Sequence, residues 1–562
     1  MNKYKKISLA SLCPLLAFTL TACIDLEDND SSNSNSSSTQ YEKSTFITGA
    51  DIHSANGIYF NAEDQLFIAS GIGSEIVTMN PENGEIIQRM GVEDGIEEPD
   101  DLTFGPDGSL YWTGVLTGDV GKISPDGNKT IIAQGLLGVN PITFSDDGRL
   151  FAGLCLFGDA LYELDPDGIE PPRLVVDGLA NDVGSCSVNA MDFGSDGFLY
   201  GPRLYAGEVI RINVDSGEFS TVANGFGNPV AVKFNSQGQL HVLDTLTGEV
   251  LRVDKDSGSK EVITTLAPGL DNLAFDSQDR LYVSSYVDGT VTEVLSDGSF
   301  RVLNQGGLAS PGGLAIVEQP NKETLYAADG LSLMAIDTTT KEQEVVLRSV
   351  ASDGYPGAVS VANFGPYLLI SSWFDSTVNI WDPQQKEMVL TISDFPLPVN
   401  AIEFQGDVIV AESYTKSIYR LKTGTAPEVL ASSLGAPAGL VALDNNLWIS
   451  DQINGTVLQI IQDGITLEEP IIIATGLSSP EGLAFSADGN LLVVEAGAGK
   501  LSSIDMNTGE IETIASNLQI GLEGLGPIVP STYIFNGVTV DSSGKIYLSG
   551  DKGNIIYQFD AI

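Results

Sequence analysis

Short apolar segments alternate with tight turns along almost the whole chain. The first segment of each unit opens on a polar or small residue and continues with alternating apolar positions, as in DDLTF from Asp100, DNLAF from Asp271 and EGLAF from Glu481. A turn such as GPDG or SADG follows, and then a second apolar segment such as LYWTG or LLVVE. Alternation with a period of two and Asp-Gly turns predict antiparallel hairpins, and no segment sustains the period of an amphipathic helix.

This hairpin is part of a longer unit that repeats about every 44 residues. A third segment such as GEVLRVD and usually a fourth such as KEVITTL complete the unit. Four short antiparallel strands at this period predict the blades of a β-propeller, so the expected fold is all-β. The twelve units begin at Asn56, Asp100, Asn140, Asn189, Val230, Asp271, Gly312, Gly357, Asn400, Ala438, Glu481 and Asn536.

The two ends of the repeat region indicate how the twelve blades divide. The segment STFITGADI precedes the first unit and reads as a lone outer strand, whereas the last unit stops after its third strand, GNIIYQFDAI. Propellers typically have about four to eight blades. We therefore expect two six-bladed rings, residues 41–296 and 297–562, each closed by a borrowed outer strand. A single twelve-bladed ring closed by the same strand is the alternative.

The composition supports a large folded protein and excludes one class of partner. Apolar residues make up 42% of the 562 residues, enough for extensive buried cores. The chain has 27 Lys and Arg against 75 Asp and Glu, a formal net charge of −48. A nucleic-acid partner is not expected, because neutralising phosphates requires a basic face.

The N-terminus carries an export signal. Lys3, Lys5 and Lys6 precede a short apolar stretch that ends in LTAC, which resembles a bacterial lipobox. This resemblance implies a signal peptide over residues 1–22, cleavage before Cys23 and lipidation of its thiol. Residues 23–40, rich in Ser, Asn and Asp, then form a flexible tether. The predicted location is the cell envelope, on the outer membrane of a Gram-negative bacterium and held by lipid only; an ordinary secretory peptide is the alternative.

Two cysteines remain after export. Cys155 and Cys186 would face a compartment where disulfides persist, so we expect a bridge between neighbouring blades. Two free buried thiols are the alternative. Zinc is not expected, because the chain has only two His and no paired-cysteine motif.

The blade strings resemble a known group of propellers. PEGLAFSADGNLLVVE, PDDLTFGPDGSLYWTG and FNGVTVDSSGKIYLSG resemble the SMP-30/gluconolactonase-like and NHL-type families, and are similar to virginiamycin B lyase. The resemblance covers nearly all of residues 41–562. In the gluconolactonase-like family it implies calcium, or another divalent ion, bound in the central channel by side chains at the start of the innermost strands. Carried onto this chain, the metal ligands are Asn56, Asp100, Asn140, Asn189 and Asp271 in the first ring, and Asn400, Glu481 and Asn536 in the second.

Two functions are compatible with this resemblance. In the first, a calcium-dependent hydrolase opens a sugar lactone or a similar ester, and Asp100 or Asp271 orients or deprotonates the attacking water. In the second, the propellers bind a small molecule or a protein without catalysis, and the Asn and Asp side chains cap strand turns. The family's Glu is replaced by Asn56 if blades are counted from the start, which departs from the enzyme pattern. A monomer is expected in either case.

A further acidic position recurs at the ends of the second strands. Because it repeats in both rings, we interpret it as a scaffold feature that bonds a neighbouring loop, rather than as a site. Its members are Asp244, Asp329, Glu412, Asp451 and Glu495.

Overall fold

The computed structural model describes residues 39–562 except 180–185, 187, 321, 351–356, 394, 423–424, 525–531 and 533. The predicted signal peptide, the lipidated Cys23 and nearly all of the tether lie outside the described residues. The chain from Gln40 to Ile562 forms one compact unit. Among the described residues, no helix is long and apolar enough to span a membrane.

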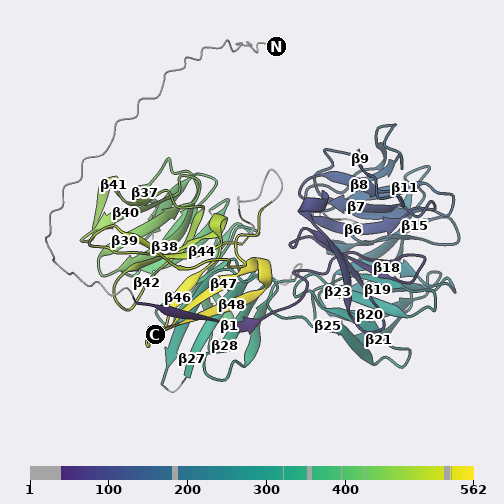
Figure 1. The fold of residues 1–562 in the computed structure, drawn as a ribbon. Coiled ribbons are helices and arrows are strands. Elements are labelled where there is room, and N and C mark those ends of the chain that lie inside the picture. Colours follow the sequence, from purple (N-terminus) through teal and green to yellow (C-terminus); the bar gives the residue numbers. More distant parts are fainter. Residues whose placement is uncertain are drawn as a thin grey trace, which may run out of the picture. The chain divides into compact units, whose positions relative to one another are not determined.

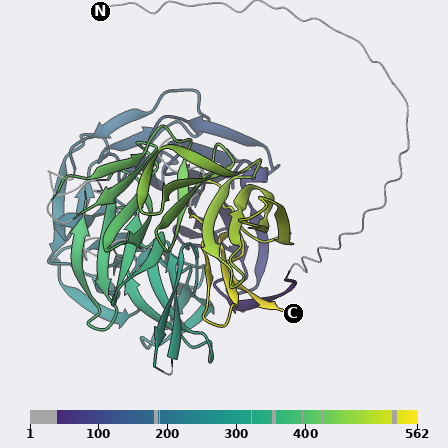
Figure 2. The ribbon, with the colours of Figure 1, turned by 90° about the vertical axis from the view of Figure 1, so that its left-hand side faces the viewer.

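All strands belong to twelve antiparallel sheets of four strands each, which confirms the predicted tandem propeller (Figure 1). The innermost strand of each blade contacts that of the next, and in each ring the sixth contacts the first. There are therefore two closed six-bladed rings and not one ring of twelve. Figure 2 looks onto the blades of the second ring, from teal through green to yellow.

The first ring contains six blades whose strands follow one another in sequence. They are β2 (Ile58–Phe60), β3 (Leu66–Ser70), β4 (Glu75–Met79) and β5 (Ile86–Met90); β6 (Pro99–Phe104), β7 (Leu110–Gly114), β8 (Asp119–Ile123) and β9 (Lys129–Ala133); β10 (Val139–Phe144), β11 (Leu150–Leu154), β12 (Leu161–Leu164) and β13 (Arg173–Val176); β14 (Asp192–Phe193), β15 (Leu199–Arg203), β16 (Glu208–Ile212) and β17 (Phe219–Asn224); β18 (Pro229–Phe234), β19 (Leu240–Asp244), β20 (Glu249–Val253) and β21 (Lys260–Thr265); β22 (Leu270–Phe275), β23 (Leu281–Ser285), β24 (Val291–Val294) and β25 (Phe300–Asn304).

The second ring contains the other six blades. They are β26 (Leu314–Gln319), β27 (Lys322–Asp329), β28 (Ser332–Asp337) and β29 (Gln343–Arg348); β30 (Ser360–Phe364), β31 (Tyr367–Ser372), β32 (Thr377–Asp382) and β33 (Glu387–Ile392); β34 (Pro398–Phe404), β35 (Asp407–Glu412), β36 (Ser417–Leu421) and β37 (Glu428–Ala431); β38 (Pro437–Leu443), β39 (Asn446–Asp451), β40 (Thr456–Gln462) and β41 (Ile465–Thr475); β42 (Pro480–Phe485), β43 (Leu491–Glu495), β44 (Lys500–Ile504) and β45 (Ile511–Ala515); β46 (Val538–Val540), β47 (Ile546–Gly550), β48 (Ile555–Ala561) and β1 (Tyr41–Thr48). Four short 3-10 turns complete the described elements: η1 (Val92–Asp94), η2 (Leu204–Ala206), η3 (Ala496–Ala498) and η4 (Asp551–Gly553).

Only the second ring borrows a strand, and this moves the boundary between the rings. β1 pairs with β48 from Tyr41↔Ala561 to Thr48↔Ile555, and Figure 1 shows the two side by side in purple and yellow. The first ring closes without a borrowed strand, because β25 is its own outer strand and ends at Asn304. The predicted boundary after Ser296 thus cuts through a blade: the sequence reveals strands, but not which strand pairs with which.

The first ring is consequently an insertion between β1 and β26 of the second ring. The outgoing and returning segments meet, because Ala50 donates its backbone N–H to the Leu308 carbonyl at 2.8 Å. Gly49 bonds the Asn554 carbonyl at 2.6 Å, and His53 Nε2 lies 2.8 Å from the Asp551 carbonyl oxygen. Chain contacts therefore tie the start of the first ring to the last blade of the second.

A closed circle of aromatic contacts joins the blades of the first ring. In each blade, a ring on the second strand lies against the Phe that ends the innermost strand of the next blade, with centroids 4.9 to 5.4 Å apart. Four of the six pairs are edge-to-face and two are tilted, and aromatic pairs in edge-to-face geometry stabilise beyond the area they bury. His241 occupies one of these positions and packs on Phe275, so it is a packing residue between blades. The pairs are Phe67–Phe104, Tyr111–Phe144, Phe151–Phe193, Tyr200–Phe234, His241–Phe275 and Tyr282–Phe60.

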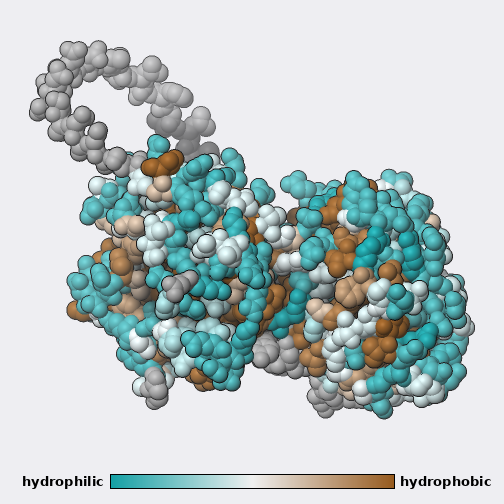
Figure 3. Space-filling view, turned by 90° about the horizontal axis from the view of Figure 1, so that it is seen from below, coloured by the Kyte–Doolittle hydropathy of each residue, from teal (hydrophilic) through white to brown (hydrophobic). Residues whose placement is uncertain are grey.

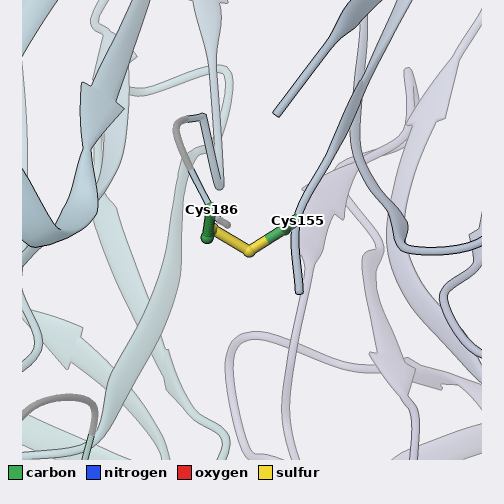
Figure 4. The surroundings of a disulfide bond; sticks show 2 residues. All are labelled: Cys155 and Cys186. Atoms are coloured by element: carbon green, nitrogen blue, oxygen red, sulfur yellow. A yellow bond between two sulfur atoms is a disulfide. The ribbon is translucent and has the colours of Figure 1, made fainter. Parts of the chain in front are cut away.

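A disulfide links the third and fourth blades of the first ring. Cys155, just after β11, is bonded to Cys186, which precedes β14, and their Cα atoms are 4.0 Å apart (Figure 4). Both residues are buried. The predicted pairing is present.

The surface reflects the acidic composition. Hydrophilic side chains cover much of the face seen in Figure 3, and brown apolar patches interrupt them. Most of the chain's 75 Asp and Glu residues are exposed to solvent. The few buried acids are therefore candidates for function.

Candidate functional site in the channel of the first ring

Five polar residues lie at the inner-strand starts of the first ring, as predicted. Asp100, Asn140 and Asp271 lie within β6, β10 and β22, whereas Asn56 lies two residues before β2 and Asn189 three residues before β14. Val230 in β18 is the apolar sixth position. Asp100 and Asp271 are each 8% exposed, so both are buried but not completely shielded from solvent.

Amide groups of the three Asn residues converge on the two carboxylates. Asn56 Nδ2 lies 3.3 Å from Asp100 Oδ1, which joins blades one and two. Asn140 also bonds the Asp100 side chain, and Asn189 bonds that of Asp271. The structure therefore brings together all five residues that the sequence assigned to this ring.

Burial raises the pKa values of the two carboxyl groups at this end of the channel, which we call the mouth and which Asp100, Asp271, Asn56, Asn140 and Asn189 line. Burial, with the neighbouring Asp101 charge, raises the pKa of Asp100 to about 7. Burial and the charges of Asp100 and Asp101 raise the pKa of Asp271 well above its ordinary value. Each carboxylate thus lowers the cost of placing a positive charge in the mouth.

The orientation of Asn56 corrects its predicted role. Its Oδ1 accepts hydrogen bonds from Ser54 Oγ at 2.8 Å and from the Gly71 backbone N–H at 3.2 Å. Because these two donors bind Oδ1, they hold the Asn56 side-chain amide in the orientation that directs its nitrogen toward Asp100. Asn56 is therefore a hydrogen-bond donor to a carboxylate, and it does not present an oxygen to a cation.

A second polar layer lies one residue further along the same strands. Asn272 Nδ2 donates to Asp101 Oδ1 at 3.1 Å, and the Ile142 backbone N–H donates to Asp101 Oδ2 at 3.1 Å. Asp101 is 3% exposed, and burial raises its pKa to about 6, although the Lys233 charge opposes that shift. The Asp101–Asn272 bond joins blades two and six behind Gly57 of blade one.

A buried lysine lies deeper in the same channel. Lys233, in β18, donates from Nζ to the Met191 carbonyl at 3.2 Å, and Nζ is 5.7 Å from the centroid of the Tyr59 ring. Its charge also opposes the burial-driven rise in the pKa of Asp192, whose Oδ2 accepts the Phe234 N–H at 2.8 Å.

Sequence reasoning missed this inner layer because it considered only the first position of each repeated string. The second and fourth positions of the same strings carry the signal. They are apolar or small in most blades, but hold Asp101 in DDLTF, Asn272 in DNLAF, Asp192 in NAMDF and Lys233 in VAVKF.

The second ring does not assemble its predicted ligands into a site. Glu481 is fully buried, and burial, with the Asp551 charge, raises its pKa to about 8. Its Oε1 accepts Gln452 Nε2 at 2.9 Å and its Oε2 accepts the Asn536 backbone N–H at 2.7 Å, so both oxygens have partners within the protein. Asn400 instead accepts a bond from Ser360 Oγ at 2.9 Å.

The Asn536 side chain has a structural role as well. Its Oδ1 accepts the Gly521 N–H at 2.9 Å and its Nδ2 donates to the Ser549 carbonyl at 3.2 Å. The polar side chains predicted as ligands in this ring therefore have a structural role: they form hydrogen bonds that hold neighbouring loops and strands together. These residues are Asn400, Glu481 and Asn536. The sequence could not show this, because the same residue types serve both purposes.

The recurring acids hold the connections between blades, as interpreted from the sequence. Asp244 is the clearest case: its oxygens accept the backbone N–H groups of Gly227 at 2.6 Å and Asn228 at 3.0 Å. Asp329, Glu412, Asp451 and Glu495 accept backbone N–H groups of the preceding connection in the same way.

Among the described residues, no group of three or more His, Cys, Asp or Glu side chains suited to a metal ion occurs. The first-ring mouth instead combines two carboxylates with amides. This donor set fits a hard cation that accepts mixed oxygen ligands, with Asp100, Asp271, Asn140 and Asn189 as the residues able to supply them.

Comparison with known proteins assigns this chain to no family. No family model and no curated protein matches the chain, so no match supports the SMP-30/gluconolactonase-like resemblance in particular. A streptogramin B lyase structure is similar at 16% identity and a TM-score of 0.37, over 51% of this chain and 94% of that one. A structure of catalytically inactive virginiamycin B lyase from Staphylococcus aureus with quinupristin is similar at 15% identity and a TM-score of 0.37, over 51% of this chain and 96% of that one. The extracellular domain of a putative one-component system from B. thetaiotaomicron is similar at 12% identity and a TM-score of 0.31, over 91% of this chain and 76% of that one.

At these values the similarities carry no argument about activity. The strand pairing of the chain itself defines the class: an all-β protein of two six-bladed propellers, the first inserted into the second. The polar, acid-lined channel of the first ring is its candidate functional site.

Proposed function

We propose that the first ring binds one divalent cation, with calcium as the expected ion, at the mouth of its channel. The observation that carries this proposal is the convergence of Asp100 and Asp271 with the amides of Asn140 and Asn189. Calcium takes about six to eight oxygen ligands, and water would complete the set that these four residues supply. Both carboxylates are buried, and among the described residues no lysine or arginine forms an ion pair with either, so a bound cation would offset the cost of burying them.

Calcium binding is tested by thermal melting and calorimetry of the mature chain with calcium and with chelator. A ligand that binds only the folded state stabilises it by about 2.7 kcal/mol when present at about 100 times its Kd. Asp100→Asn or Asp271→Asn should remove most of that increment, because each takes away a charged ligand.

Asp244→Asn is the matched control. Asp244 is equally acidic and lies in the same ring, but it bonds backbone N–H groups of a connection. The variant should lower the melting temperature and leave the calcium increment intact. An unchanged wild-type melt in chelator would contradict cation binding and favour a propeller that binds its ligand without metal.

Hydrolysis of a small lactone or ester is a second candidate for the same mouth. The residual 8% exposure of Asp100 and of Asp271, against 0% for Glu481 in the second ring, favours the first ring as the place of this reaction. A bound divalent cation would supply carbonyl polarisation. Asp100 or Asp271 would hold the attacking water in position. Turnover of a sugar lactone by the wild type and its loss in Asp271→Asn would support this reaction; calcium binding without turnover would leave a binding protein.

We also propose that the propellers are carried on the cell envelope as a lipoprotein. The support is the lipobox-like LTAC that ends at Cys23 and the polar tether that leads to β1. Lipid would be the only membrane attachment, and the propellers would act as a monomer at the end of the tether.

A further inference from the structure

An arginine of the second ring holds the start of blade six in the first ring. Arg348 ends β29; its Nη1 donates to the Pro268 carbonyl at 3.0 Å and its Nη2 donates to Asp288 Oδ2 at 2.5 Å. Pro268 lies two residues before β22, and Asp288 lies in the loop between β23 and β24. The two charged side chains are only 19% and 14% exposed. One planar guanidinium therefore bonds two segments of the other ring.

These two segments are also bonded to each other, directly beside Asp271. The Tyr286 backbone N–H donates to the Gly269 carbonyl at 3.1 Å, and Leu270 pairs with Ser285 in the ladder between β22 and β23. Asp271 is the next residue of β22. The position of this carboxylate thus depends on a strand start that the arginine of the second ring holds from outside.

Val350, two residues after Arg348, packs at the same strand start. It is buried, and its Cγ1 is 3.4 Å from the point where a Cβ on Gly269 would lie. Val287, in the loop between β23 and β24, reaches within 2.4 Å of the same point. The second ring therefore supports this segment by packing as well as by hydrogen bonds.

The second ring also contacts blade two, whose inner strand carries Asp100. Val115 and Leu116, in the loop that follows β7, belong to one buried hydrophobic cluster with Ile534 and Phe535 of the second ring. Both acids of the proposed cation site consequently lie on blades that the second ring contacts.

We infer that Arg348 is a positioning residue of the proposed cation site, supplied to the first ring by the second. It acts through the Pro268 carbonyl and Asp288, which fix the start of β22 and so the place of the Asp271 carboxylate. The site therefore depends on both rings, and a cation bound in the first ring stabilises the contact between them. This inference rests on the proposed function in naming the cation.

The test is calcium calorimetry on the mature chain, with Arg348→Met as the main variant. Loss of a group that orients a metal ligand should weaken calcium binding by about tenfold. The direction of the change is diagnostic, because removal of a positive charge would by itself tighten the binding of a cation.

Arg280→Met is the matched control. Arg280 lies on the same blade and also pairs with a carboxylate, Asp276, at 2.5 Å, but this pair lies in the turn at the other end of β22 from Asp271. The variant should change the calcium Kd by less than about twofold, since distant sites act independently.

Arg348→Lys protects the test against misfolding of Arg348→Met. It keeps the charge but lacks the fork of donors that reaches both Pro268 and Asp288, and it should weaken calcium binding by about threefold. Because the charge is unchanged, a weaker affinity in this variant reports positioning alone.

Hydrogen exchange in chelator gives a readout that needs no bound ion. Amides of residues 269–271 and 285–290 should exchange about tenfold faster in Arg348→Met than in the wild type, because a local opening would no longer have to break the two arginine contacts. Arg280→Met should leave the exchange of these amides unchanged.

The outcomes separate the inference from the proposed function. Weaker calcium binding with faster exchange in the Arg348 variants supports both. Unchanged or tighter binding in these variants overturns only the role of Arg348. If the wild type binds no calcium, the proposed function fails and exchange alone decides: faster exchange around Asp271 supports positioning by Arg348. Unchanged exchange there overturns the inference whatever the calcium affinity.

Discussion

Asn272 on blade six and Asp101 on blade two are joined by a 3.1 Å hydrogen bond that passes behind Gly57 of the intervening blade. The bond is possible because Gly57 has no side chain: a Cβ there would lie 2.3 Å from Asp101 Oδ1 and 2.9 Å from the Asp100 carbonyl oxygen. One glycine thus permits a cross-channel bond that supports the acid layer at the mouth.

Gly57→Ala should therefore destabilise the first ring by about 2 kcal/mol or more, because backbone and a buried carboxylate would have to move. Denaturant unfolding followed by far-UV circular dichroism measures the change. Gly91→Ala is the control, since a Cβ at Gly91 meets only the Ser74 carbonyl oxygen at 3.6 Å. Similar costs at both positions would contradict the steric explanation.

Removal of the disulfide should also weaken the first ring. The bridge between Cys155 and Cys186 spans 31 residues, and a loop of that size corresponds to about 3.7 kcal/mol in the chain-entropy account. A Cys155→Ser/Cys186→Ser variant should unfold at lower denaturant concentration. Reductant should shift the wild type to the same midpoint and leave the variant where it is; a wild type indifferent to reductant would argue against a stabilising bridge.

Glu481 gives the second ring a pH-dependent stability. Burial raises its folded-state pKa to about 8, from an ordinary value of 4.5. A raised pKa means that folding takes up a proton between these values, so the stabilisation is complete below pH 4.5 and is lost as the pH rises through 8. The loss from pH 5 to pH 9 should amount to about 4 kcal/mol for this group.

Glu481→Gln mimics the protonated acid and should flatten this decline in melts recorded across that range. Some slope should remain, because burial also raises the pKa of Asp329 to about 7. A variant whose decline matches that of the wild type would show that Glu481 does not couple to folding.

The closing strand offers a test of the ring assignment. Phe46 in β1 is 3% exposed and packs on Tyr547 with ring centroids 5.0 Å apart. Phe46→Ala should cost the second ring about 3 kcal/mol and speed hydrogen exchange in β48, while exchange in the first ring stays unchanged. Phe300→Ala, on the half-exposed outer strand of the first ring, should have little effect.

The mature N-terminus can be read directly. Mass spectrometry of the protein from bacterial membranes should find a lipid-modified Cys23 as the first residue. Cys23→Ser should release the protein from the membrane fraction without altering its melting temperature. An unmodified terminus at another residue would rule out the lipobox interpretation.

The architecture could be predicted because each blade repeats its own local signals. Alternating apolar positions, Asp-Gly turns and the terminal Phe of strings such as DDLTF recur in most blades, and each acts within one blade or between two neighbours. The boundary between the rings could not be predicted in this way. It depends on the pairing of β1 with β48, two strands more than 500 residues apart whose sequences carry no mark of each other.

The candidate site was predictable in part for the same reason. Position in the repeat placed Asp100, Asp271, Asn140 and Asn189 at one mouth, which the structure bears out. It could not reveal which atom of the Asn56 amide faces inward, because Ser54 and Gly71 decide that. Nor could it show that Glu481 has a structural role. Two of its hydrogen-bonding partners lie on the connection that carries Thr532 and Asn536, more than 50 residues further along the chain.

The insertion of one ring into the other sets an order of folding events for a chain that is delivered N-terminus first. β1 is synthesised first and must wait for β48, which is nearly the last segment to emerge. The intervening blades close on themselves, so the first ring can complete its fold while the second still lacks most of its strands. Between the completion of β25 at Asn304 and the arrival of β48, the chain thus carries one finished propeller and an unpaired β1, whose open strand edge is free to pair with other chains.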